Sequence, residues 1–320
     1  MKIVALVLTI ALSAPAQAQL PSPHAIEIPS WFTETLLDLR ADVKEAAAQG
    51  KRVMLYFGQD GCPYCTALIR TNFTQPKIVE KTRRHFVAIA LNLWGDREVT
   101  GSDGRTLREK DFARTLRVQF TPTLLFLDQK GEVALRLNGY YPPHRFEAAL
   151  DYAAGAAGSG LSFADYMKAT VKESASPTLH DDPLFRPPPV ELRRGRLVAL
   201  IFETPYCAGC DELHRDGLKR AEVRKLLARF DVYRLGFEDR RGPTTTWAAA
   251  LGVAYTPTIV LFDGGREVFR IEAYVRAFHL AGALDYVASG AYRKEPSFQR
   301  YLQGRAERLR ARGEAVDLWK

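Results

Sequence analysis

The sequence has few cysteines, and they are not spaced as structural cross-links would be. Its 320 residues include only four. A structural disulfide stabilises most when it closes a long loop, because it then removes more entropy from the unfolded chain. Here Cys62 is followed by Cys65 and Cys207 by Cys210, so each Cys-x-x-Cys pair encloses only two residues. The better interpretation is a pair of disulfides that are repeatedly made and broken.

Metal and haem sites are the other common uses of such pairs. Zinc ribbons bring their two pairs within about 15–20 residues of each other, whereas 141 residues separate Cys65 from Cys207. Haem attachment requires a histidine directly after the second cysteine, and Thr66 and Asp211 stand there instead. We therefore expect no metal and no cofactor beyond the redox-active disulfides. A soft-ion site, as in a copper chaperone or binding scaffold, stays an open alternative.

Long apolar runs are scarce as well. The longest, residues 3–12, follows Lys2 and precedes small residues that end at Ala18. A membrane span needs about 20 apolar residues, so this pattern predicts a secretory signal peptide over 1–18, cleaved after about Ala18. We expect a periplasmic protein whose mature form is not embedded in the membrane.

Recognisable nucleic-acid-binding motifs are absent, although the chain is basic. Lys and Arg total 45 against 37 Asp and Glu, for a formal net charge of +8. The excess is spread along the sequence, except near the C-terminus at residues 305–312. Export and the missing motifs argue against a nucleic-acid partner. We expect the tail, about 300–312, to be a basic helical extension.

The two halves of the chain repeat one another. An apolar strand precedes each cysteine pair, a Thr-Pro-Thr follows each, and the same Leu-Asp-Tyr ends both halves. The offset falls from 145 residues at the cysteines to 135 at the prolines, so the first copy has about ten extra residues, placed near 94–106. Five matching blocks in the same order indicate a duplication. The blocks are 53–57 with 198–202, the two pairs, 120–123 with 255–258, 124–128 with 259–263, and 150–152 with 284–286.

Apolar patterning and turn residues predict an α/β fold in each half. The first half has expected helices at 30–49, 76–84, 107–117 and 143–154, and strands at 52–57, 86–93, 123–127 and 133–137. The second repeats this order, with a strand ending at Phe202, a strand at 232–236, a hairpin around 263–265 and a helix from about Arg276. We predict a first domain over 30–170, a Pro-rich exposed linker over 171–196, and a second domain with its helical extension over 197–312.

This order resembles the thioredoxin fold, twice in tandem, over roughly 31–155 and 190–290. The first half is similar to SoxW-like, thioredoxin-related exported proteins and to the C-terminal domain of transmembrane thiol reductants. That likeness rests on residues 94–100, 112–113 and 120–123. The resemblance implies a thiol–disulfide oxidoreductase, with protein disulfides or dithiols as substrates and a membrane thiol reductant as the electron donor.

The resemblance also implies roles for particular residues. A cysteine at a helix N-terminus meets free N–H groups and the positive end of the helix dipole, and both favour its thiolate. Cys62 and Cys207 are therefore the expected exposed nucleophiles, and Cys65 and Cys210 the expected resolving cysteines. The residues expected to bind substrate are Pro63 and Tyr64 between the first cysteines, the cis-prolines Pro122 and Pro257, and their neighbours Thr121 and Thr256.

Several positions depart from the thioredoxin pattern. Gly61 and Tyr206 replace the usual Trp before the first cysteine, and Tyr56 and Ile201 replace the buried acid six residues before it. The nearby acids, Asp60 and Glu203, are candidates to substitute for it, but we interpret both as solvated turn residues, and His214 as a surface residue and not a base.

The sequence indicates the direction of electron flow less directly than it indicates the fold. The Pro63-Tyr64 dipeptide resembles glutaredoxins, whose potentials lie between reducing thioredoxins and the oxidising DsbA type. Oxidants usually carry a helical insertion, and the ten extra residues here are too few for one. The sequence favours a reductase or isomerase, and a disulfide-introducing oxidant is the alternative.

Overall fold

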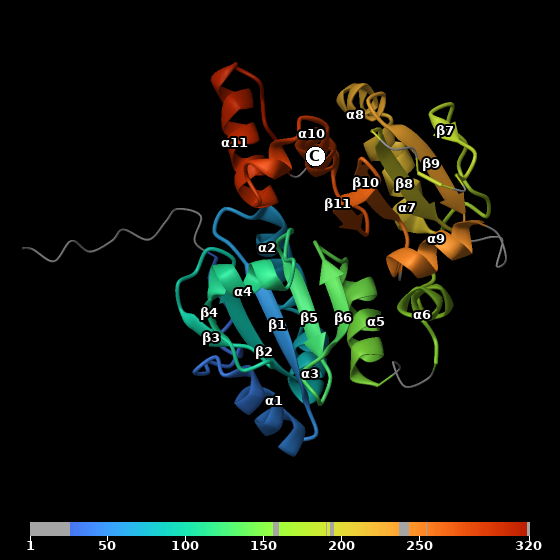
Figure 1. Cartoon of the computed structure of the whole chain (residues 1–320). Coiled ribbons are helices and arrows are strands. Elements are labelled where there is room, and N and C mark those ends of the chain that lie inside the picture. The colour runs from blue at the N-terminus through green and yellow to red at the C-terminus, as the bar shows by residue number, and fades with distance from the viewer. Residues whose placement is uncertain are drawn as a thin grey trace, which may run out of the picture.

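The computed structural model describes residues 26–155, 160–189, 191–192, 195–236, 243–253 and 255–318. Within them, two mixed sheets with helices packed against them form two domains that lie side by side (Figure 1). The predicted signal peptide, 1–18, lies outside the described residues, so it stays a prediction.

The first domain is built on a four-stranded sheet in the order β2-β1-β5-β6. Strand β1 is parallel to β2 and antiparallel to β5, which pairs with β6 in a hairpin. Strand β1 lies inside the sheet and, as the sequence predicted, delivers the first cysteine pair to the start of a helix. The strands are β1 (Arg52–Gly58), β2 (Phe86–Asn92), β5 (Thr123–Leu127) and β6 (Val133–Asn138).

Alternation along β1 explains why this strand is apolar throughout. Met54 and Tyr56 belong to one apolar cluster, whereas Val53, Leu55 and Phe57 belong to another. Successive side chains of a strand point to opposite faces, so both faces of the sheet are buried. A strand covered on both sides reads as a continuous hydrophobic run.

Helices cover both faces of this sheet. The predicted helix over 30–49 is wrong at its start, because α1 begins at Leu39 and Asp38, not Ser30, is its N-cap. The Asp38 side chain accepts hydrogen bonds from the N–H groups of Arg40 and Ala41, which satisfies donors left free at the helix start. The helices are α1 (Leu39–Ala48), α2 (Pro63–Ala67), α3 (Pro76–His85), α4 (Glu109–Thr115), α5 (Pro143–Ala154) and α6 (Phe163–Thr170), with a π-helical turn η1 (Leu68–Asn72).

The extra residues of the first copy form a small hairpin where the sequence placed them. Strand β3 (Glu98–Thr100) pairs with β4 (Thr106–Arg108). Glu109, 1% exposed, holds this segment by accepting hydrogen bonds from the N–H groups of Asn92 and Arg97. The Arg97 guanidinium also donates to the same carboxylate at 2.6 Å.

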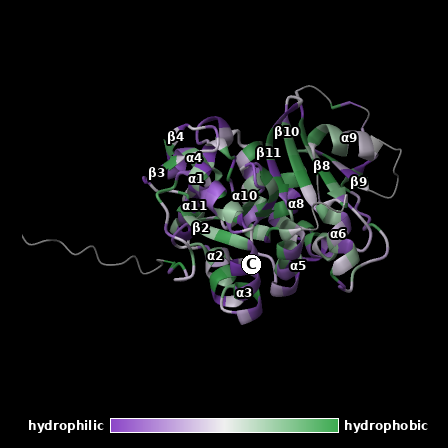
Figure 2. Cartoon of the chain, turned by 90° about the horizontal axis from the view of Figure 1, so that it is seen from below, coloured by the Kyte–Doolittle hydropathy of each residue, from purple (hydrophilic) through white to green (hydrophobic). Residues whose placement is uncertain are grey.

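The second domain repeats the architecture with a fifth strand, in the order β11-β10-β8-β9-β7. Figure 2 shows β8 and β10 coloured as hydrophobic, in keeping with their place inside the sheet. Its strands are β7 (Phe185–Arg186), β8 (Leu197–Glu203), β9 (Asp231–Gly236), β10 (Thr258–Asp263) and β11 (Arg266–Glu272). Its helices are α7 (Ala208–Glu212), α8 (Ala221–Leu227), α9 (Pro243–Leu251), α10 (Ala277–Ala288) and α11 (Phe298–Ala311), with π-helical η3 (Leu213–Leu218) and the 3-10 turn η4 (Ala291–Arg293).

The predicted linker over 171–196 is more ordered than its composition indicated. Strand β7 adds to the edge of the second sheet, where Phe185 pairs with Val232. Earlier in the same segment, the Ser176 carbonyl accepts a hydrogen bond from the Tyr206 N–H at 2.8 Å. The segment lies along the second domain because backbone pairing satisfies polar groups that its Pro- and Ser-rich sequence could not satisfy alone.

The domains are packed together through the loop before Pro122. Phe120 comes from the first domain, yet it belongs to the hydrophobic core of the second. Its ring centroid lies 5.4 Å from that of Phe298 on α11 and 5.8 Å from that of Phe269 on β11. Figure 1 shows α10 and α11 above the end of the first domain that carries α2. The expected C-terminal helix is therefore part of the interdomain contact.

Candidate active sites

Each cysteine pair begins a helix that follows the central strand of its sheet. Cys62 is the N-cap of α2 and accepts a hydrogen bond from the Cys65 N–H at 3.1 Å. Cys207 is the N-cap of α7 and accepts one from the Cys210 N–H, also at 3.1 Å. Both pairs are disulfide-bonded, with Cα–Cα distances of 5.3 and 5.2 Å. After reduction, the same N–H groups favour a thiolate at the first cysteine.

A cis-proline loop lies against each pair. The Thr121–Pro122 and Thr256–Pro257 peptide bonds are both cis, the geometry that the resemblance implies. The Cys62 sulfur lies 3.3 Å from the Thr121 carbonyl oxygen. In the second domain, the Thr256 hydroxyl lies 3.6 Å from the Cys207 sulfur. The structure thus brings each predicted threonine to its cysteine, and their role in binding substrate stays a prediction.

The structure explains why a glycine, Gly209, lies between the cysteines of the second pair, which the sequence analysis did not predict. A Cβ atom at Gly209 would lie 3.1 Å from the Pro257 Cδ. A ring carbon cannot move aside as the end of a flexible side chain can, so Gly209 permits the close approach of the cis-proline loop. The glycine at position 209, between the two cysteines, was the sequence signal that could have predicted this close approach.

The two pairs differ in exposure. Cys207 is partly exposed, with Cys210 behind it at 3%. Cys62 was predicted to be exposed, and this is wrong, because only 4% of it is accessible. The second domain lies over this site: the Tyr64 hydroxyl is 3.4 Å from His279 Nδ1.

Two further contacts hold α11 over the first site. Gln299 accepts a hydrogen bond from the Gln59 side chain at 2.9 Å and donates one to the Gln119 carbonyl at 2.9 Å. The Arg300 guanidinium lies 5.2 Å from the centre of the Trp94 ring. No local sequence pattern predicts such cover, because it comes from residues about 200 positions away.

A cavity of about 780 Å³ between the domains opens onto the second pair. Cys207 lines it directly, and tyrosines and arginines from both domains form much of its wall. Burial raises the pKa of Tyr64 above its usual range, so its hydroxyl stays protonated and can donate a hydrogen bond. Of the residues predicted to bind substrate, the cavity is lined by Tyr64, Thr121, Thr256 and Pro257, but not by Pro63 or Pro122.

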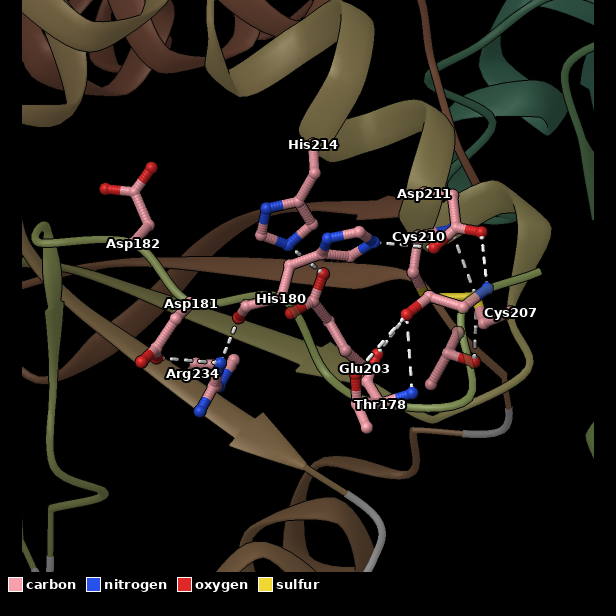
Figure 3. A network of polar contacts seen from close by, with 12 residues as sticks. Thr178, His180, Asp181, Asp182, Glu203, Cys207, Cys210, Asp211, His214 and Arg234 are labelled. Carbon is pink, nitrogen blue, oxygen red and sulfur yellow. Dashed lines mark hydrogen bonds and ion pairs between the residues drawn. A yellow bond between two sulfur atoms is a disulfide. The ribbon is translucent and has the colours of Figure 1, made fainter.

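Beneath the second pair lies a buried polar network that the sequence reading placed in solvent. Glu203 is 0% exposed and His214 is 6% exposed, so both predictions of solvated positions are wrong. The Glu203 Oε1 lies 2.7 Å from His214 Nε2, and the His214 ring stacks on His180 with centroids 4.5 Å apart (Figure 3). His180 Nε2 lies 2.6 Å from the Asp211 carboxylate. Burial of Glu203 is possible because His214 provides its partner.

The first site has no equivalent pair, because Gly58 and Ile69 stand at the positions that correspond to Glu203 and His214. Tyr56 corresponds to Ile201. Tyr56 is 1% exposed, and its hydroxyl has no hydrogen-bond partner among the described residues. Burial raises the pKa of Tyr56 above its usual range, so this group is neutral. Asp60 is exposed, as predicted. The duplicated sites therefore differ in their buried charge as well as in their accessibility.

Neither a metal cluster nor a membrane span is found in the described part of the chain. Across 26–155, 160–189, 191–192, 195–236, 243–253 and 255–318, no three His, Cys, Asp or Glu side chains are grouped to hold a metal ion. The same residues include no helix with the length and apolar character needed to cross a bilayer.

Comparison with known proteins agrees with the duplicated architecture. The sequence profile of a family described as a thioredoxin-like domain matches residues 39–154 and 192–288. A thioredoxin-fold protein from Helicobacter pylori is 25% identical, with a TM-score of 0.34, over 38% of this chain and 80% of that one. A thioredoxin from Thermus thermophilus is 27% identical, with a TM-score of 0.31, over 38% and 88%.

A third solved structure, the reduced C-terminal domain of DsbD from Neisseria meningitidis, is 15% identical, with a TM-score of 0.27. It covers 29% of this chain and 81% of its own. Among curated proteins, no relative matches the sequence.

Proposed function

Because this chain belongs to the family of thioredoxin-like domains, we propose that it is an exported thiol–disulfide oxidoreductase that reduces or isomerises protein disulfides. The geometry of the second site carries this proposal: Cys207 begins a helix, has a cis-proline loop beside it, and faces a cavity. A sulfur held in this way can be attacked or can attack without local unfolding.

The reaction is a pair of thiol–disulfide exchanges. The Cys207 thiolate attacks one sulfur of a substrate disulfide, forms a mixed disulfide and releases the other substrate sulfur as a thiolate. The Cys210 thiolate then attacks Cys207, closes the protein disulfide and releases the second substrate thiolate. Two electrons pass from the protein dithiol to the substrate, and two protons from the protein thiols pass to the solvent or the products. An external thiol donor must then reduce the Cys207–Cys210 disulfide again.

The cavity supports a protein substrate that presents its cysteine on an extended segment. Thr256 and Pro257 line one wall beside Cys207, and Tyr64 and Thr121 of the first domain line another. Tyrosine hydroxyls and backbone groups can bind an extended peptide without demanding a particular side chain.

The predicted signal peptide supports a periplasmic location, where a membrane thiol reductant would supply electrons. The short β3–β4 hairpin, in place of a helical insertion, supports the reducing direction. The dipeptide Pro63-Tyr64 resembles glutaredoxins, whose potentials are intermediate. The SoxW-like subtype belongs to this proposal.

The reduction potential of each pair tests the direction. We would equilibrate C207S/C210S and C62S/C65S full-length variants with glutathione or dithiothreitol buffers and measure the dithiol fraction by alkylation and mass spectrometry. Potentials on the order of −250 mV would support a reductase. Potentials near about −120 mV would instead assign a disulfide-introducing oxidant, and a pair that does not cycle would have no redox role.

A further inference from the structure

Each copy of the repeat covers the redox site of the other copy, and the two covers differ. We propose that helix α6 of the first domain forms a wall of the substrate site at the second pair, and that Ala164 on this helix keeps the site open for an uncharged, extended peptide segment. At the first pair, Gln299 of α11 fills the equivalent place and excludes such a segment. The inference rests on the proposed thiol–disulfide exchange, and it holds for either direction of electron flow.

Helices α6 and α11 are equivalent parts of the repeat. Ser162 is the N-cap of α6 and Ser297 is the N-cap of α11. The side chain of each serine accepts a hydrogen bond from the N–H group three residues later, as helix N-caps do. The two serines are 135 residues apart, so Ala164 on α6 corresponds to Gln299 on α11.

The phenylalanine after each serine contacts the opposite domain in the same way. The Phe298 ring of α11 lies 5.4 Å from the Phe120 ring of the first domain. The Phe163 ring of α6 lies 5.9 Å from the Tyr255 ring of the second domain. Phe120 and Tyr255 are themselves equivalent, because each directly precedes a Thr-Pro-Thr. Each helix therefore lies against the Thr-Pro loop of the opposite domain.

At the first pair, two glutamine side chains fill the place beneath the helix. The Gln59 amide donates hydrogen bonds to Gln299 Oε1 at 2.9 Å and to the Thr121 hydroxyl at 3.0 Å. Gln299 is 5% exposed and donates to the Gln119 carbonyl at 2.9 Å. The Trp94 indole N–H donates to Gln59 Oε1 at 2.6 Å. The chain's own side chains thus occupy the polar groups beside this Thr-Pro loop.

At the second pair, smaller side chains leave the same place open. Thr204 and Ala164 stand where the first site has its two glutamines, and Thr256 stands where it has its threonine. All three line the cavity of about 780 Å³, together with Cys207. Sites that enclose a small ligand measure about 300–1,000 Å³, so the cavity suits a short extended segment that carries the reacting cysteine.

Helix α6 reaches from the first domain to the second cysteine pair. The Lys168 ammonium lies 5.7 Å from the centre of the Tyr206 ring, and Tyr206 directly precedes Cys207. The helix and its N-cap therefore form a continuous wall of the cavity rather than touching it at one point. The residues in this wall are Ser162, Phe163, Ala164, Asp165, Met167 and Lys168.

The lining favours an uncharged segment. Arg145 Nε donates to the two Glu173 carboxylate oxygens at 2.8 and 2.9 Å, so these two charges neutralise each other. The buried Tyr274 hydroxyl has no hydrogen-bond partner among the described residues, and a peptide carbonyl would satisfy it. The charges of the lining balance, with basic Arg145, Lys168 and Arg276 against acidic Asp165, Glu173 and Glu212.

The test compares a probe that needs the cavity with one that does not. We would use the full-length, reduced C62S/C65S variant as the second-pair parent. The peptide probe is a capped peptide of Gly, Ala and Ser with one central cysteine, disulfide-bonded to 2-mercaptoethanol, and the small probe is 2-hydroxyethyl disulfide. In both reactions the protein dithiol is oxidised to its disulfide and the probe is reduced to two thiols. Acid quenching and mass spectrometry give the rate at each probe concentration.

In this parent, Ala164→Gln should raise the half-saturating peptide concentration about ten-fold, because the longer side chain takes the place of the peptide. The rate with the small probe should stay within about two-fold of the parent, because that probe does not need the wall. Ala169→Gln is the matched control, since it makes the same change at an exposed position of α6 outside the cavity lining. It should react like the parent with both probes.

The reciprocal change is made in the full-length C207S/C210S variant. Gln299→Ala should raise the ratio of the peptide rate to the small-probe rate at the first pair about ten-fold, because it removes the side chain that fills the site. Gln303→Ala, at an exposed position of the same helix, is the matched control and should leave this ratio unchanged.

The outcomes separate this inference from the proposed function. Equal half-saturating concentrations in Ala164→Gln and Ala169→Gln would overturn the inference, as would an equal slowing of Ala164→Gln with both probes, which indicates distortion of the site. An equal ratio in Gln299→Ala and Gln303→Ala would refute the role of Gln299. A second-pair parent that the small probe oxidises, but that shows no saturation with the peptide, would overturn this inference alone. A parent that neither probe oxidises would overturn the proposed function as well.

Discussion

The interdomain contact at Phe120 provides a quantitative test of how the first redox pair is closed. The Phe120 side chain is 6% exposed, and its ring contacts are with Phe269 and Phe298 of the other domain. A buried Phe→Ala replacement costs about 3–5 kcal/mol. Because both ring partners lie across the interface, most of this loss should fall on docking of the domains.

A loss of about 3 kcal/mol on docking corresponds to about a 100-fold larger population of separated domains, at about 1.4 kcal/mol for each factor of ten. The second domain contacts the first around Cys62, at Tyr64, Gln59 and Trp94, so we expect the reaction of Cys62 with an external reagent to follow that population. In the reduced Phe120→Ala variant, we expect alkylation of Cys62 by iodoacetamide to accelerate by one to two orders of magnitude. Cys207, which already lines the cavity, should change much less.

The assay is timed alkylation followed by peptide mass spectrometry, in buffer without denaturant. Phe112→Ala is the matched control, because Phe112 is 7% exposed and stacks on Phe57 inside the first domain, on the other face of its sheet. An unchanged Cys62 rate in Phe120→Ala, or an equal increase in Phe112→Ala, would refute the proposed cover by the second domain.

Three further perturbations have a defined direction. Burial lowers the pKa of His279 to about 4 from 6.5, so the folded state binds fewer protons than the unfolded state. The free energy of unfolding, measured in urea, should therefore be highest above about pH 6.5 and fall by about 3 kcal/mol toward pH 4. His279→Gln should flatten this dependence, and an unchanged profile would contradict it. Tyr206 adopts φ 58°, so Tyr206→Gly should raise the free energy of unfolding by up to about 1 kcal/mol, and with it the urea midpoint. A lower midpoint would count against backbone strain there. Gly209→Ala should slow glutathionylation of Cys207 by displacing the Pro257 loop, and an unchanged rate would show that the loop adapts.

Much of the fold was predictable because its signals are local. The β1 and β5 strands, the β5–β6 hairpin and helix α5 lie where the apolar pattern and the turn residues predicted them. The duplication helped as well, because the same pattern occurs in both halves and therefore predicts the same architecture for both. The helix at Leu39 was misplaced because Ser30 and Asp38 are both acceptable N-caps, and only packing selects between them.

The sequence by itself determined that two Cys-x-x-Cys pairs begin helices, because a strand, a turn and a helix start are encoded within a few residues of each pair. Only the tertiary structure decided that Cys62 is covered, that Cys207 faces a cavity, and that Glu203 and His214 are buried partners. A charged residue in a turn is usually solvated, so burial becomes possible only when a distant group satisfies it. Exposure and electrostatic pairing depend on elements far apart in the chain, and those contacts made the two copies unequal.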